Sequence, residues 1–353
     1  MKQEQNLTEG PVLKTLLAFT VPFIIANVIQ ALYGAVDLFV IGRYCPPESV
    51  AAVSTGTQVT QIITSMITGL TLGSTILVGK YTGMNAKEEV KKTIGTTLSV
   101  FALAALALTA AMLLFVTPIL ELLKTPEQSF ALARQYVVIC SCGIFFICGY
   151  NAISAILRGY GDSRRPMMFI ALSCALNVAG DVILVKYAGL GVAGVALATI
   201  GSQAISMICA IVYLNRSRFI FTFTLSNLRI DSQKVRELAA VGIPISLQEC
   251  MVRPSFLYPT SVTNRLGVYA AAAVGIASKY DVFAMLPATS TANALAAVTA
   301  QNYGAGKPER ARASLFAGLG FAVAASSLFW LWAQSSPETM IGMLIRDGAI
   351  INE

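Results

Sequence analysis

The sequence contains nine predominantly apolar runs, each long enough to cross a lipid bilayer as a helix, which takes about 20 residues. Charged residues make up 12% of the chain, about half of their share in soluble proteins. The runs leave no stretch of domain size outside them, so we expect an all-α integral membrane protein with about nine transmembrane helices. They cover residues 16–41, 50–78, 94–116, 134–157, 167–187, 191–214, 238–262, 268–300 and 312–333.

The net charge of +7 is interpreted as a topology signal. Most lysines and arginines fall in the N-terminus and in alternate loops, for example Lys91, Arg164, Arg216 and Arg310. Cytoplasmic loops of membrane proteins carry such an excess of positive charge. We therefore expect a multi-pass protein of the cell (plasma or inner) membrane with a cytoplasmic N-terminus. Its partners are expected to be membrane lipid and small molecules, with no nucleic acid, and the protein is expected to be a monomer.

Histidine is absent from the chain, which excludes His-based catalysis and His-ligated metals. The seven cysteines include no Cys-x-x-Cys pair, so we interpret them as small apolar residues. No paired motif of a membrane protease is found either. We therefore expect no enzyme activity and no cofactor.

A repeat relates the first and the seventh apolar runs. Each contains a proline near its start, Pro22 and Pro244, and a glycine-led polar turn follows 61 and 60 residues later, at Gly83 and Gly304. Copies with an even number of spans run parallel, and such repeats place substrate sites between two halves near the middle of the bilayer.

The repeat predicts how the chain is divided. We expect an N-lobe of six transmembrane helices at 1–214, a cytoplasmic inter-lobe linker at 215–236 and a partial C-lobe of three helices at 237–353. A second copy as long as the first extends beyond residue 353. We therefore expect the chain to be C-terminally truncated by three helices.

Three stretches carry a family resemblance. They read LYGAVD at 32–37, ILRGYGDSRRP at 156–166 and AQNYGAGKPERA at 300–311. On these stretches the chain resembles the multidrug and toxic compound extrusion (MATE) transporters. The resemblance implies twelve helices in two six-helix lobes related by a parallel repeat. It also implies the exchange of Na⁺ or H⁺ for lipophilic, often cationic organic compounds.

The resemblance implies a cation-binding or coupling site at Asp37, Asn177, Asp181 and Thr199, with a hinge in the first helix at Pro22. The residues suit that role, because Asn177 and Asp181 are four apart and share a helix face. Carboxylate, amide and hydroxyl oxygens are the ligands of hard cations, so Na⁺ is expected at Asp37, Asn177 and Asp181. Two acids in a dry site repel, which makes protonation the alternative way to neutralise them. The competing interpretation is that Asp181 is solvated near the outer surface.

Three further residues are candidates for substrate contact or for a site in the second lobe. Glu249 lies in the seventh run and is either a ligand or an ion-pair partner of Arg253, four residues away. Tyr33 and Tyr150 are either walls of a drug cavity, through cation–π contact, or ordinary packing residues.

We expect a secondary active antiporter that exports lipophilic, often cationic compounds or drugs, with Na⁺ or H⁺ as the coupling ion. One alternative is a flippase of a related fold for lipid-linked oligosaccharides or polysaccharides. Such a flippase needs several cationic residues around phosphate. The interiors of the apolar runs offer few, namely Arg253 and Lys279. The other alternative is a non-transporting membrane fragment.

Overall fold

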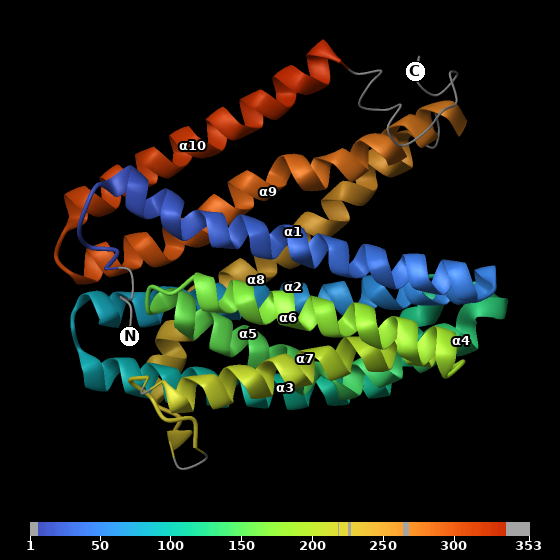
Figure 1. Cartoon of the computed structure of the whole chain (residues 1–353), viewed down its shortest axis with the longest axis horizontal. Helices are drawn as coiled ribbons and strands as arrows, with labels where there is room; N and C mark the ends of the chain where they lie inside the picture. The colour runs from blue at the N-terminus through green and yellow to red at the C-terminus, as the bar shows by residue number, and fades with distance from the viewer. Residues whose placement is uncertain (1–5, 218, 225–226, 264–267, 337–353) are drawn as a thin grey trace.

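The structure is a computed structural model that describes residues 6–217, 219–224, 227–263 and 268–336, without the side chains of 253–279 and 281–282 (Figure 1). Helices dominate the described residues. In chain order they are α1 (Val12–Tyr44), α2 (Pro47–Gly83), α3 (Lys87–Leu122), α4 (Glu127–Cys142), α5 (Ile144–Gly159), α6 (Arg164–Asp181), the π-helix η1 (Val182–Tyr187), α7 (Gly191–Arg216), α8 (Ser232–Thr263), α9 (Val268–Gly304) and α10 (Pro308–Ser335).

Every predicted apolar run falls on helix, but one run is broken. The run 134–157 is divided between α4 and α5, which meet at Gly143 with a bend of 48°. A Cβ atom at Gly143 would overlap the side chain of Ile200 on α7. The bend therefore lies where glycine, which has no side chain, lets α7 approach closely. Hydropathy does not predict this contact.

The first seven α-helices form one bundle, in which they run side by side along the long axis of the molecule (Figure 1). The bundle buries large side chains from distant parts of the sequence, including Ile41 on α1, Phe101 on α3 and Leu157 on α5. Other large apolar side chains point outward, such as Phe39 and Leu114, which are 72% and 75% exposed. An apolar exterior of this kind is stable in lipid, where burial of apolar surface does not drive helix association.

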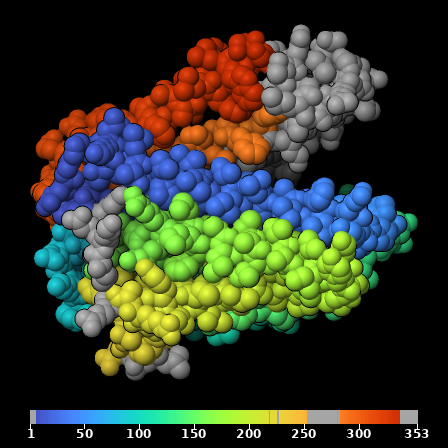
Figure 2. All heavy atoms as spheres, viewed as in Figure 1, coloured from blue at the N-terminus to red at the C-terminus, as the bar shows by residue number. Residues whose placement is uncertain are grey.

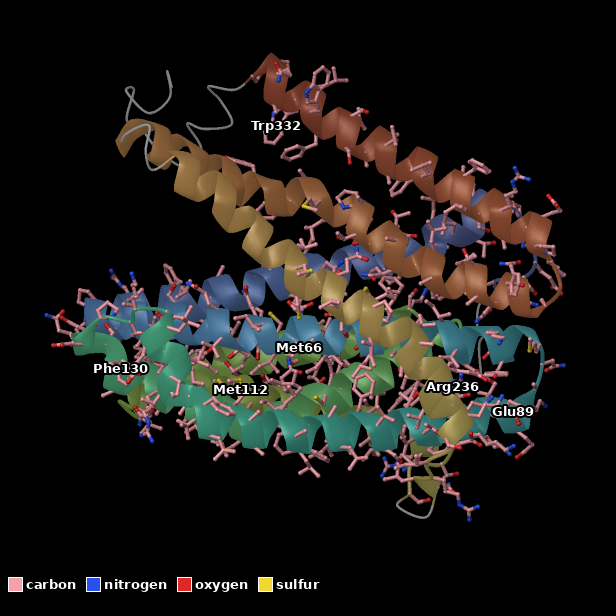
Figure 3. The ribbon with its side chains drawn as sticks, turned by 180° about the vertical axis from the view of Figure 1, so that it is seen from behind. Met66, Glu89, Met112, Phe130, Arg236 and Trp332 are labelled. Carbon is pink, nitrogen blue, oxygen red and sulfur yellow. The ribbon has the colours of Figure 1, made fainter. Side chains whose placement is uncertain are left out.

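The helices α9 and α10 lie along one side of this bundle, and α8 crosses the bundle obliquely to reach them (Figure 3). In Figure 1, α9 and α10 are close to α1 near its first residues and diverge from it toward its last residues. Figure 2 shows the same separation for the atoms of α10, in red, and α1, in blue. The helix α8 crosses α2, and the hydroxyl of Ser246 donates a hydrogen bond of 2.7 Å to the carbonyl of Met66.

Polar contacts join the two groups of helices at the end where α8 begins. Lys234 of α8 is 2% exposed, and its Nζ lies 2.8 Å from a carboxylate oxygen of Glu89 on α3. The same Nζ lies 3.8 Å from the ring centre of Tyr81 on α2, and the hydroxyl of Tyr81 donates to Glu237 at 2.7 Å. Figure 3 shows Glu89 and Arg236 at this end of the molecule. We call Lys234, Glu89, Tyr81 and Glu237 the end cluster.

The connection between α7 and α8 is packed against the bundle. Phe219 and Phe221 are 8% and 5% exposed. The hydroxyl of Thr96 on α3 accepts a hydrogen bond from the backbone N–H of Asp231 at 3.1 Å. The helix α8 begins at Ser232, so residues 232–236 of the expected linker are helical. The lobe boundaries proposed from the sequence stay a prediction.

Candidate functional site

Asp37 of α1 lies against α6 and α7 inside the bundle. Its side chain is within interaction distance of Asp181 and Asn177 on α6 and of Thr199 on α7. Asp37 is 4% exposed, and Asn177 and Asp181 are 0% exposed. A solvated Asp181 at the outer surface is incompatible with this burial. The four side chains therefore form one interior group, which we call the carboxylate cluster.

Several polar atoms of the carboxylate cluster have no hydrogen-bond partner. They are Oδ1 of Asp37, both oxygens of Asp181, and both the amide oxygen and nitrogen of Asn177, all buried. Buried polar atoms in proteins are nearly always paired, and an unpaired one costs about 1–3 kcal/mol. A Na⁺ ion bound by the carboxylate and amide oxygens, or a proton shared between the carboxylates, would pair most of these atoms. The donor set of this chain thus fits a bound cation.

The backbone next to the carboxylate cluster departs from α-helical geometry. Asp181 is the last residue of α6, and the six residues after it form the π-helix η1. The wider turn is closed by a hydrogen bond of 2.9 Å from the N–H of Ala188 to the carbonyl of Ile183. Short π-helical segments are rare and often lie at functional sites. No feature of the apolar run predicted this one.

Tyr33 connects α1 to α7 one turn before Asp37. Its hydroxyl lies 2.9 Å from the hydroxyl of Ser202 and 3.3 Å from the carbonyl of Thr199. The hydroxyl of Ser202 donates to that same carbonyl at 2.9 Å. Because Tyr33 and Asp37 are four residues apart, they share a face of α1. Tyr33 therefore holds the carboxylate-bearing turn against α7.

A cavity of about 270 Å³ lies beside the carboxylate cluster, between α1, α2, α5, α6, α7 and α9, and we call it the N-lobe cavity. Tyr33 and Thr199 form part of its wall, whereas Asp37, Asn177 and Asp181 do not. Polar side chains dominate the rest of the lining. They include five threonines of α2 and the amides Asn27, Gln30, Asn151 and Gln203; the threonines are Thr60, Thr64, Thr68, Thr71 and Thr75.

The remaining sequence candidates occupy different places. Pro22 is buried within α1, which continues as one helix through it. Tyr150 lines the N-lobe cavity, and its hydroxyl donates to the carbonyl of Pro166 at 2.9 Å. Glu249 is half-buried on α8 and is not part of the cavity lining. Its suggested partner Arg253 has a side chain outside the described residues.

Sequence reasoning missed Arg158, which lines the N-lobe cavity. The predicted apolar run ended at residue 157 and left Arg158 among the basic loop residues, but Arg158 is the last residue but one of α5. Its guanidinium carbon lies 4.6 Å from the ring centre of Phe23 on α1. Ser202 and the threonines of α2 were also missed, although threonines at positions 60, 64 and 68 repeat at helical spacing.

An all-helical bundle that encloses a polar cavity and a cluster of buried carboxylates defines the class as a multi-pass membrane transporter. Solved structures share the fold. MATE in its bent conformation matches with a TM-score of 0.92 at 22% identity, covering 100% of this chain and 79% of that one. An outward-facing multidrug resistance MATE family transporter matches with a TM-score of 0.90 at 23% identity, covering 100% and 78%. This likeness establishes the two-lobe fold.

The sequence model of the MatE family matches residues 22–183 and 244–353, and the chain belongs to this family. Among curated relatives, the probable multidrug resistance protein YoeA of Bacillus subtilis is 28% identical over 322 residues, covering 89% of this chain and 70% of YoeA. The FAD transporter of Shewanella oneidensis is 24% identical over 338 residues, covering 94% and 74%. The multidrug export protein MepA of Staphylococcus aureus is 23% identical over 359 residues, covering 99% and 78%. Two of these relatives are named for transport or export, and YoeA is named for multidrug resistance.

Proposed function

We propose that the chain acts as a secondary active antiporter, which exports organic compounds in exchange for Na⁺ or H⁺ taken up at the carboxylate cluster. The observation that carries the proposal is the set of buried, unpaired oxygens on Asp37, Asn177 and Asp181. A cation is the ligand that such a set accepts. Membership of the MatE family and the relatives named as multidrug proteins support drug export.

The position of the carboxylate cluster suggests how cation uptake acts on the substrate. The helix α1 carries Asp37 and also contributes Asn27 and Tyr33 to the wall of the N-lobe cavity. Neutralising the carboxylates removes their repulsion and lets α1 move relative to α6 and α7. Pro22 weakens the helix because it removes one backbone hydrogen bond. We propose that α1 then bends at Pro22 and shrinks the cavity, which releases the substrate.

The energy available to such a cycle is adequate. A membrane potential of 100 mV stores about 2.3 kcal/mol for each charge that crosses the membrane. That energy supports roughly a 50-fold concentration gradient of substrate for each ion. The chain is proposed to act in the cell membrane with its N-terminus in the cytoplasm, as the basic loops indicate.

The test is transport in vesicles that contain the purified chain. Export of a fluorescent cation, rhodamine 123, and of a fluorescent anion, 4-methylumbelliferyl phosphate, is measured in parallel while Na⁺ and proton gradients are imposed separately. We expect one of the two gradients to drive export, and we expect Asp37→Asn to abolish the dependence because it removes the charge while keeping the shape. Glu121→Gln is the matched control, since Glu121 is an exposed carboxylate at the end of α3. Gradient-driven export that persists in Asp37→Asn would refute the assignment.

A further inference from the structure

The N-lobe cavity contains one positive charge, which forms no ion pair with any described side chain. Arg158 is the one charged residue among the described residues of its lining. The ion pairs within the described part of the chain involve other lysines and arginines. An arginine stays protonated in proteins, and a charge removed from water is costly unless it is paired. The Arg158 guanidinium is therefore a cation of the cavity wall that an anionic ligand could pair with.

Contact with the ring of Phe23 holds the Arg158 guanidinium in position. The guanidinium of Arg158 lies over the Phe23 ring, a contact worth about 0.5–2 kcal/mol. At the same level, Thr75 of α2 donates a hydrogen bond of 3.2 Å to the carbonyl of Ala155 on α5. The end of α5 is thus held between α1 and α2. Since a ring face offers no hydrogen-bond acceptor of the strength of a carboxylate, the N–H groups of Arg158 remain available to a ligand.

The rest of the lining favours a ligand that carries hydrogen-bond donors. Thr60, Thr64 and Thr68 each donate their hydroxyl hydrogen to the carbonyl four residues earlier, at 2.9–3.0 Å. Their oxygen lone pairs are left to accept. The side-chain oxygen of Gln203 is also without a hydrogen-bond partner among the described residues. A molecule with hydroxyl or amide hydrogens would satisfy these acceptors.

We propose that the N-lobe cavity binds a polar organic anion, with its carboxylate or phosphate group on Arg158 and its hydroxyl or amide hydrogens on the threonines of α2. A guanidinium forms two parallel hydrogen bonds with either anionic group. The inference rests on the proposed export function, for which it names the substrate class. It replaces the cationic substrate expected from the family resemblance with an anionic one.

The test is the binding of three coumarin probes to the purified chain in lipid nanodiscs, measured by fluorescence anisotropy. The probes are neutral 7-methoxycoumarin, 7-methoxycoumarin-3-carboxylate and 4-methylumbelliferyl phosphate. We expect at least one anionic probe to bind about tenfold or more tightly than the neutral one, as charged hydrogen bonds predict. The tighter of the two anions distinguishes a carboxylate substrate from a phosphate ester.

Three variants assign the effect to a residue. Arg158→Gln is expected to remove the preference for the anion, whereas Arg158→Lys is expected to keep part of it because the charge remains. Arg164→Gln is the matched control, because Arg164 is exposed in the same motif and its removal changes the net charge equally. Equal binding of all three probes, or an anion preference that survives in Arg158→Gln, would overturn the proposal.

The outcome is separable from that of the proposed function. Gradient-driven export of rhodamine 123 without any preference for anionic coumarins leaves the export function standing and refutes the anion site. An anion preference that depends on Arg158, without gradient-driven export of any probe, supports the anion site and refutes the export function.

Discussion

The end cluster allows a quantitative test of how α8 is held against the bundle. The perturbation is a double-mutant cycle of Lys234→Met and Glu89→Gln. Lys234 is 2% exposed, with its Nζ 2.8 Å from Glu89. A charge-assisted hydrogen bond contributes about 1.5–3 kcal/mol, but the Glu89 side chain is 36% exposed and solvent screening reduces the value. We expect a coupling energy of about 1.5 kcal/mol, which is roughly tenfold in the unfolding equilibrium.

The cycle is more informative than either single variant. Lys234→Met also removes the cost of burying a charge, so its own effect on stability combines opposing terms. The assay is unfolding of the purified chain in mixed micelles with increasing SDS. The control cycle uses Lys91 and Glu88, an exposed pair within α3, for which we expect about 0.5 kcal/mol or less. A coupling below about 0.3 kcal/mol for Lys234 and Glu89 is additive within error and would refute the ion pair.

Two further predictions test the helix contacts around the candidate site. Tyr33→Phe removes the hydrogen bond to Ser202, so we expect unfolding in SDS to show a loss of about 1 kcal/mol together with weaker gradient-dependent export; an unchanged export would contradict a role in holding α1. Gly83→Val places side-chain atoms where the carbonyl of Gln301 lies, so we expect a loss of more than about 2 kcal/mol. Gly34→Ala, with no atom within 4 Å of the new methyl group, is expected to be neutral or stabilising, and equal losses in both glycine variants would refute the packing argument.

Helix was predicted along every apolar run because the signal is local. Six helices of the described residues, or seven if α4 and α5 count as one span, are long and apolar enough to cross a membrane, against the nine expected. Each run of apolar residues had to become a helix, since a bilayer leaves no other way to satisfy the backbone of a single segment. The prediction was incomplete at Gly143, where one run became α4 and α5. The sequence shows a glycine there, but the close approach of Ile200 on α7 can be seen only in the tertiary structure.

The candidate site was reached in part by physical reasoning and in part by resemblance. Helical spacing predicted that Asn177 and Asp181 share a face, whereas Asp37 and Thr199 were implied by the family resemblance. That these residues meet was implied by the same resemblance, because no local rule relates α1 to α6. The structure places them together, and their role in coupling remains a proposal.

Sequence alone determined that this chain is a helical membrane protein of the MatE family, because hydropathy and the motif LRGYGD are readable residue by residue. Tertiary structure decided which way the side chains face. Arg158 reads as a basic loop residue in the sequence, yet the packing of α5 against α1 and α2 turns it into the N-lobe cavity. Helical periodicity fixes which residues share a face. Only the rotation and crossing of neighbouring helices, set by side-chain packing, determine what that face meets.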